Sequence, residues 1–452
     1  MNYKGVLPKN KDWRAISEDL MFEKIYYYFD EGVSFQSLHE MEDLVINLNN
    51  LVSGFDVFNA LDIISNYCSE GPLPYPHDLY SYEGLFHTIE NVLINSSDPV
   101  EIYHCMIIFA FIATIKHDDE SFFIQNQFLE KTIGISISNN FNIVTALMIM
   151  LSNLLSDSAI CIKVAVSVYN FGFSYISEFL FSIYDTSIVF HVLRFFYRLV
   201  EVVFHSNEEA LSELSGCIPV ILACVEKEEK LALSILRYLL GNDDCIKTVI
   251  GFNIENILIN QISKVDRFTF VNCICCVNEL ILIDSYSVEL FEKVMPYIPK
   301  ILNSMNENRI SPILSFLDHT IENEKDHLLE IHKVYDSLLM YIECSKYINK
   351  KDTILFFCRI INKHISNESM KDNPIFKRFL IQIFDFLPYF KDNDIIIVLA
   401  SIQEWLEIDE LFISVIGNQC NISSSLEQIV NDRSDNASAI ARLLISNKFF
   451  DF

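Results

Sequence analysis

One kind of segment returns along the whole chain. A polar or helix-capping residue opens it, a strongly apolar stretch of 12–18 residues with helical periodicity follows, and a short acidic or amide-rich turn closes it. Such a pattern predicts a long, largely buried α-helix. The clearest copies cover residues 98–118, 142–157, 229–243, 267–284, 308–323, 351–367 and 393–409, and weaker copies cover 56–69, 187–206 and 436–447.

The copies recur at a nearly constant distance. From the turn at Ser69 to the turn at Asn447, nine intervals cover 378 residues, an average of about 42. A unit of this length cannot bury its apolar faces alone, so neighbouring units must stack into a continuous core. We therefore expect an all-α, right-handed α-solenoid of about ten three-helix repeats with a concave groove. Residues 31–452 would form one continuous domain, and residues 1–30 a tail or capping helix. The alternative, an irregular helical bundle, gives no reason for a constant period.

Two shorter helices fit between successive long ones. The sequence predicts short helices over 245–250 and 254–262, with Gly251 allowing a sharp turn between them because glycine has no Cβ. Pro219 suits the first turn of another short helix. The residues expected to cap long helices are Asp98, Asp352 and either Asp392 or Asn393.

Two of the units resemble armadillo repeats. Residues 151–158, Leu-Ser-Asn-Leu-Leu-Ser-Asp-Ser, are similar to the end of an armadillo third helix. Residues 232–243, continuing into 248–251, resemble the corresponding stretch of importin-α adaptors. The armadillo resemblance covers residues 45–447. The importin-α resemblance implies that an Asn on each groove-lining helix holds the backbone of an extended basic peptide, while a Trp one turn earlier holds the Lys or Arg stems by stacking and cation–π contact.

The chain departs from this importin-α array. The positions aligned with the Asn are Asn66, Ala113, Asn153, Arg198, Tyr238, Glu279, His319, Asn362 and Glu404. The positions one turn earlier are Asp62, Phe109, Ile149, Arg194, Ser234, Cys275, Ser315, Cys358 and Ala400, and none of them is Trp. Either the chain recognises something other than a standard nuclear-localisation peptide, or it shares only the fold.

The candidate groove residues taken from this row are Asn66, Asn153, Tyr238, Glu279, His319, Asn362 and Glu404. An amide offers both a donor and an acceptor to an extended backbone. The two carboxylates, with the histidine between them, would make the groove acidic and partly pH-sensitive. The alternative is that the amides satisfy neighbouring helix ends and that the carboxylates form an ordinary solvated face.

The charge balance favours a basic partner. The chain holds 33 Lys and Arg against 61 Asp and Glu, a formal net charge of −28 at pH 7. A nucleic-acid binder needs a positive surface to displace phosphate counterions, so nucleic acid is excluded as a partner. Because an acidic surface also serves solubility, the charge alone does not establish a ligand.

No apolar stretch reaches the roughly 20 residues that cross a bilayer. We expect no membrane insertion and a cytoplasmic or nuclear location.

Signatures of enzymes and metal sites are absent from the sequence. It contains no GxSxG, GxxxxGK, GxGxxG or HExxH motif. Cys273, Cys275 and Cys276 lack a second pair or histidines at zinc-ligand spacing, so we expect them to be buried packing residues. We expect no catalytic residues, metal or cofactor.

The sequence thus favours a non-enzymatic scaffold or adaptor that binds an extended, basic peptide or partner protein in an acidic concave groove. Importin-α-like nuclear transport is one form of this hypothesis. The alternative is a general armadillo/HEAT scaffold in cytoskeletal, trafficking or signalling assemblies, with no role in nuclear import. A catalytic protein built on helical repeats is a third class, which no residue pattern supports.

Overall fold

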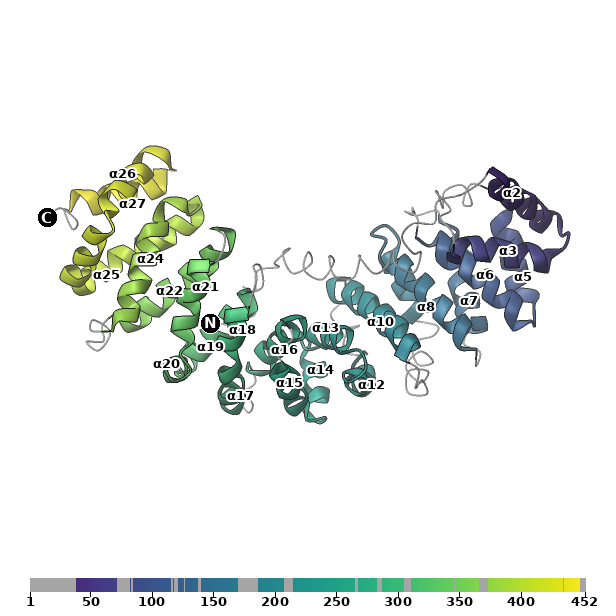
Figure 1. Ribbon diagram of the computed structural model, residues 1–452, viewed down its shortest axis with the longest axis horizontal. Coiled ribbons are helices and arrows are strands. Elements are labelled where there is room, and N and C mark those ends of the chain that lie inside the picture. Colours follow the sequence, from purple (N-terminus) through teal and green to yellow (C-terminus); the bar gives the residue numbers. More distant parts are fainter. Residues whose placement is uncertain are drawn as a thin grey trace. The chain divides into compact units, whose positions relative to one another are not determined.

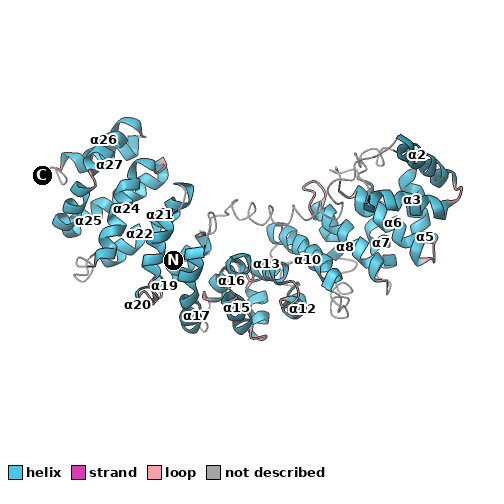
Figure 2. Ribbon diagram, in the orientation of Figure 1, coloured by secondary structure: helices cyan, strands magenta, loops and turns pink. Residues whose placement is uncertain are grey.

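The computed structural model describes residues 38–447 with gaps at 71–81, 83, 115–116, 118–120, 126, 137–139, 170–185, 207–213, 265–266, 283–286, 305–309, 345–346, 366–372 and 434. Every regular element in this part is a helix (Figures 1 and 2). The chain divides into two compact units, residues 1–248 (unit 1) and 249–452 (unit 2). The expected tail or capping helix at residues 1–30 lies outside the described residues.

Unit 1 alternates longer and shorter helices. The longer ones are α2 (Leu38–Ser53), α3 (Val57–Glu70), α6 (Pro99–Ile112), α8 (Phe141–Leu155) and α10 (Thr186–Ser206), and α13 (Glu229–Leu239), with 11 residues, continues their succession. The shorter ones are α5 (Leu85–Asn95), η2 (Phe122–Ile124), α7 (Phe128–Ser136), η3 (Leu214–Cys217), α12 (Ile218–Cys224) and α14 (Asp243–Ile250), the last of which crosses the boundary. From α3 onward each long helix packs against the next, in the order α3, α6, α8, α10 and α13.

Unit 2 follows the same plan. Its longer helices are α16 (Arg267–Leu280), α19 (Ser311–Glu322), α22 (Tyr347–His364), α24 (Pro374–Phe386), α25 (Asp392–Gln419) and α27 (Asp435–Ser446). The remaining helices are α15 (Ile254–Ser263), α17 (Ser287–Val294), η4 (Met295–Tyr297), α18 (Ile298–Ser304), α20 (His327–Ile331), α21 (Val334–Cys344), η5 (Leu387–Tyr389) and α26 (Ile422–Asp432). Here α16, α19, α22, α25 and α27 pack in succession. We call these helices, together with α3, α6, α8, α10 and α13, the long-helix row.

The predicted long segments match the row. Each of the ten segments overlaps one of these helices over most of its length, and the end expected at Asp409 coincides with a break in α25, where Asp409 has φ −149° and ψ 79°. Asp98 caps α6 as expected, because its carboxylate accepts a hydrogen bond from the Val100 N–H at 2.8 Å. The other expected caps are wrong. Asp352 lies inside α22, since no helix breaker stands between Tyr347 and that residue, and α25 already begins at Asp392, so the residue before it is Lys391.

The sharp turns between short helices use residues other than glycine. In place of Gly251, Asn253 takes the left-handed conformation, with φ 56°, directly before α15. Gln127, Lys333 and Asn421 do the same before α7, α21 and α26. These four residues are 126, 80 and 88 residues apart in sequence, which is about three, two and two repeat periods. The repeat is therefore visible in the backbone as well as in the sequence.

Polar contacts between successive repeats span one period. The paired residues are Ala110 with Asn153, His117 with Asp157, Asp318 with Arg359, Ile321 with Lys363, and Asn362 with Trp405, at sequence separations of 40–43. Apolar side chains fill the space beneath these contacts, including Phe109, Phe123 and Phe128 in unit 1. The cysteines Cys273, Cys275 and Cys276 are buried, as predicted.

Candidate functional site

All seven candidate residues lie on the long-helix row. Asn66, Asn153 and Tyr238 belong to α3, α8 and α13 of unit 1, while Glu279, His319, Asn362 and Glu404 belong to α16, α19, α22 and α25 of unit 2. Their exposure differs. Asn66, Asn362 and Glu404 are exposed, Tyr238, Glu279 and His319 are half-buried, and Asn153 is buried. The row therefore offers polar positions of unequal accessibility to a partner.

Asn153 holds two neighbouring helices together. Its side chain is 9% exposed, and its amide donates a hydrogen bond to the Ala110 carbonyl in α6 at 3.1 Å. Ala110 lies in the last turn of α6, where carbonyls have no partner within the helix. This is the alternative anticipated for the amides, in which they satisfy a neighbouring helix end. Any contact of Asn153 with a peptide stays a prediction.

Asn66 stands beside a polar contact between α3 and α6. Its amide donates to the Asp62 carboxylate at 3.3 Å. Nearby, His104 of α6 lies 2.6 Å from the Ser65 hydroxyl through Nδ1 and 3.5 Å from Asp62 through Nε2. Burial holds the pKa of His104 below its usual range despite the carboxylate, so the ring is neutral at pH 7. Ser65 is 2% exposed, which keeps this Ser–His–Asp group from acting as a hydrolytic site.

Tyr238 is packed among aromatic rings. Its centroid lies 5.8 Å from that of Tyr197 and 5.4 Å from that of Phe204, both in α10. The Arg237 guanidinium lies 5.9 Å from the centroid of the Tyr238 ring. Burial raises the pKa of the phenol well above its usual value, so the hydroxyl stays neutral. Tyr238 therefore contributes packing and a neutral hydroxyl.

Asn362 is bonded to the next long helix. Its amide donates to the Ser401 hydroxyl at 3.4 Å, and its oxygen accepts the indole N–H of Trp405. The Trp405 ring is fully buried in α25. Although Trp405 belongs to no array of tryptophans, it fixes the orientation of a candidate residue, a role that sequence reasoning missed.

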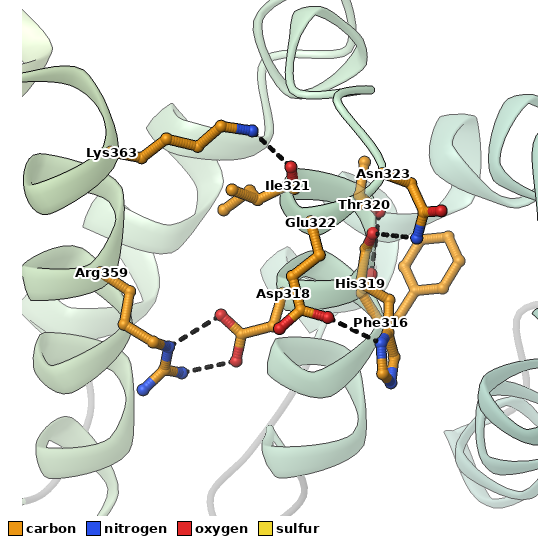
Figure 3. A network of polar contacts seen from close by, with 9 residues as sticks. All are labelled: Phe316, Asp318, His319, Thr320, Ile321, Glu322, Asn323, Arg359 and Lys363. Carbon is orange, nitrogen blue, oxygen red and sulfur yellow. Dashed lines mark hydrogen bonds and ion pairs between the residues drawn. The ribbon is translucent and has the colours of Figure 1, made fainter. Parts of the chain in front are cut away.

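A network of charged residues joins α19 to α22 around His319 (Figure 3). Arg359 donates two hydrogen bonds to the Asp318 carboxylate, from Nε at 2.8 Å and from Nη2 at 2.6 Å. The Lys363 ammonium donates to the Ile321 carbonyl in the last turn of α19. His319 Nδ1 lies 3.4 Å from a Glu322 carboxylate oxygen. The candidate histidine is thus flanked by two carboxylates.

The sequence held a signal for this network that the alignment of single positions missed. Asp318 and Arg359 are opposite charges 41 residues apart, which is one period. Residues one period apart face each other on neighbouring helices of a stacked repeat, so a search for opposite charges at that spacing would have found the pair.

Helix α10 carries two arginines at aligned positions that the candidate set omitted. Arg194 and Arg198 are 6% and 5% exposed, and Arg198 Nη1 lies 2.9 Å from a Glu201 carboxylate oxygen. His191, one turn before Arg194, is also buried, and burial followed by the Arg194 charge lowers its pKa to about 4. The ring is therefore neutral, and Arg194 and Arg198 against Glu201 give α10 a net positive charge in an acidic chain.

The described residues offer little for covalent or metal chemistry. Within them, no group of three or more His, Cys, Asp or Glu side chains is placed to hold a metal ion. Burial raises the pKa of the Cys217 and Cys358 thiols to about 12, which keeps them protonated. In the described part of the chain, no helix combines the length and apolar character needed to cross a membrane.

Two solved structures are similar to this chain. The crystal structure of an engineered armadillo repeat protein has 13% sequence identity and a TM-score of 0.68, covering 90% of this chain and 98% of that one. A structure concerned with a phosphorylation switch in the interaction between cadherin and β-catenin has 12% identity and a TM-score of 0.53, covering 90% of this chain and 96% of that one. No protein-family model and no curated protein sequence matches the chain. At these identities the likeness shows the fold alone: this is an all-α protein with the solenoid fold of armadillo repeat proteins.

Proposed function

We propose that this chain is a non-enzymatic scaffold or adaptor in which the long helices of either unit bind an extended, basic peptide or protein segment. The observation that carries the proposal is that six of the seven candidate residues, on α3, α13, α16, α19, α22 and α25, are exposed or half-buried, on a chain with a net charge of −28. The armadillo-like fold is consistent with a protein-binding scaffold. An acidic surface attracts basic partners at long range and repels acidic ones.

Unit 2 offers the sharpest test. Its candidate carboxylates are Glu279 and Glu404, and the variant Glu279→Gln/Glu404→Gln removes both charges while keeping side-chain size. The matched control is Glu427→Gln/Asp432→Asn on α26, which removes two exposed carboxylates away from the row. The probe is a fluorescent bipartite peptide of Lys and Arg clusters, and its Kd is measured by anisotropy.

We expect the row variant to weaken peptide binding about three- to tenfold, because each partly exposed charge contributes up to about 1 kcal/mol. The control should leave the Kd almost unchanged. Equal weakening by both variants would mean that net charge alone attracts the peptide. If the wild-type chain does not bind the peptide at all, a basic ligand is the wrong class.

Nuclear transport is the narrower form of the proposal, and the fold comparisons give it no specific support. It requires the exposed amides Asn66 and Asn362 to hold the peptide backbone, so Asn66→Ala/Asn362→Ala should abolish capture of a nuclear-localisation peptide in a pull-down. Undiminished capture would remove both residues from the site and favour a general scaffold with no import role.

A further inference from the structure

Arg194 is buried in α10 with hydrogen-bond donors that nothing satisfies. The residue is 6% exposed, and within the part of the chain that the structure describes its Nε and Nη2 have no acceptor. Buried donors of a charged group are expensive to leave unpaired, so such groups in folded proteins normally face an anion or an ordered water. The position calls for an acceptor that is not one of the described side chains.

A second positive charge, that of Arg198, acts on Arg194. Arg198 lies one helical turn later, and the carboxylate it pairs with is that of Glu201. Burial, followed by the Arg198 charge, lowers the pKa of Arg194 to about 10, which leaves the guanidinium charged at pH 7. His191 is neutral there. Arg194 and Arg198 thus place two charged guanidinium groups close together, and a bound anion would reduce their mutual repulsion.

The same protein shows what the unpaired donors fit. In Arg359, Nε and Nη2 form the edge that takes both oxygens of the Asp318 carboxylate, as Figure 3 shows. In Arg194 these same two nitrogens are the ones without an acceptor. This edge of a guanidinium matches the oxygen spacing of a carboxylate or a phosphate, which a water molecule does not.

We propose that the Nε–Nη2 edge of Arg194, with Arg198 beside it, binds an oxyanion, either a carboxylate or a phosphate, from outside the chain. Both nitrogens have almost no exposed surface, so an incoming oxyanion must displace the side chains that cover them. Both arginines stand at aligned positions of the row, so a bound protein segment would carry an acidic or phosphorylated side chain there. The oxyanion site is independent of the basic-segment binding proposed above, since that proposal rests on residues of other helices.

The test is a thermal-unfolding titration of the full chain at constant ionic strength, with chloride as the reference salt. The probes are inorganic phosphate, N-acetyl-phosphoserine amide and N-acetyl-glutamate amide. A ligand that binds the folded state raises Tm in a saturable way. The variants are Arg194→Met, which keeps the apolar stem, and Arg194→Lys, which keeps the charge without the two-donor edge and guards against a misfolded methionine variant. Arg359→Met is the matched control, because it removes an arginine edge that is already filled.

We expect a saturable rise in Tm for the wild type and for Arg359→Met, its loss in Arg194→Met, and an apparent Kd about tenfold or more weaker in Arg194→Lys. A response to phosphate alone identifies a free ion as the ligand, whereas a response to a capped amino acid identifies a side chain of a partner. No saturable rise in the wild type, or an equal rise in the wild type and Arg194→Lys, overturns the proposal.

Discussion

At the scale of single residues, burial decides what a polar side chain in the long-helix row does. Asn66 and Asn153 are the same residue type at the same phase of the repeat. Asn66 is exposed, whereas the Asn153 amide donates a hydrogen bond to the Ala110 carbonyl of the preceding long helix. Equivalent positions in a repeat can therefore leave a side chain accessible to a partner in one copy and use it in a stabilising hydrogen bond in another.

This difference predicts unequal costs of substitution. Asn153→Ala should lower the free energy of unfolding by about 2 kcal/mol, because it leaves the Ala110 carbonyl in a buried site without its donor. Asn66→Ala should change it by less than about 0.5 kcal/mol, as expected of an exposed side chain. Urea unfolding followed by circular dichroism measures both. Equal, small effects would show that the Asn153 bond adds nothing to stability.

The candidate residues show what sequence could and could not supply at this scale. Alignment on a repeat fixes which helix a residue belongs to and its approximate phase, and all seven candidates lie on the expected long helices. It cannot fix exposure or partners, which depend on how neighbouring helices are rotated. Helix rotation decides two features in particular, namely the bond between Asn362 and Trp405 and the unpaired edge of Arg194.

At the scale of the element, apolar periodicity located the helices well and their starts less well. A buried stripe of apolar residues extends over most of a helix, so its length follows from the pattern. The first turn is set by local capping instead. Helix α22 therefore begins at Tyr347, five residues before the expected cap Asp352. The turn before α15 depends on which polar residue tolerates a left-handed conformation, and Asn253 does so although Gly251 is two residues away.

The break in α25 gives a prediction at this scale. Asp409 leaves helical geometry, and its carboxylate accepts a hydrogen bond from the Phe412 N–H at 3.2 Å, so it caps the second half of the helix. Asp409→Ala should cost about 1 kcal/mol of unfolding free energy, the usual value of a lost N-cap. Asp409→Asn keeps an acceptor and should stay close to the wild type. Urea unfolding of the two variants compares them, and a stable alanine variant would mean that packing alone sets the break.

At the scale of the whole molecule, the repeat length is the property that the sequence predicts and that the contacts of the structure also show. Polar contacts in both units join residues 40–43 positions apart, close to the interval counted from the turns. A shared interval makes the interior of one repeat depend on the next, because each such contact has one partner in each copy. The sequence could not predict which residues make these contacts. The repeats have diverged, so a different pair of residues joins each two successive copies.

Buried and half-buried histidines couple this interior to pH. Burial lowers the pKa of His104, His191 and His364, which lie on α6, α10 and α22. Unfolding exposes each ring and restores a pKa of about 6.5, so the unfolded chain binds more protons below that pH and stability falls as pH drops. For His191, whose folded pKa is about 4, the loss extends down to that pH and is on the order of 3 kcal/mol.

Urea unfolding between about pH 7 and pH 5 should show this fall, and His191→Gln should flatten it. The control His87→Gln replaces an exposed ring and should leave the slope unchanged. A slope that is the same in His191→Gln and the wild type would assign the acid sensitivity to other groups.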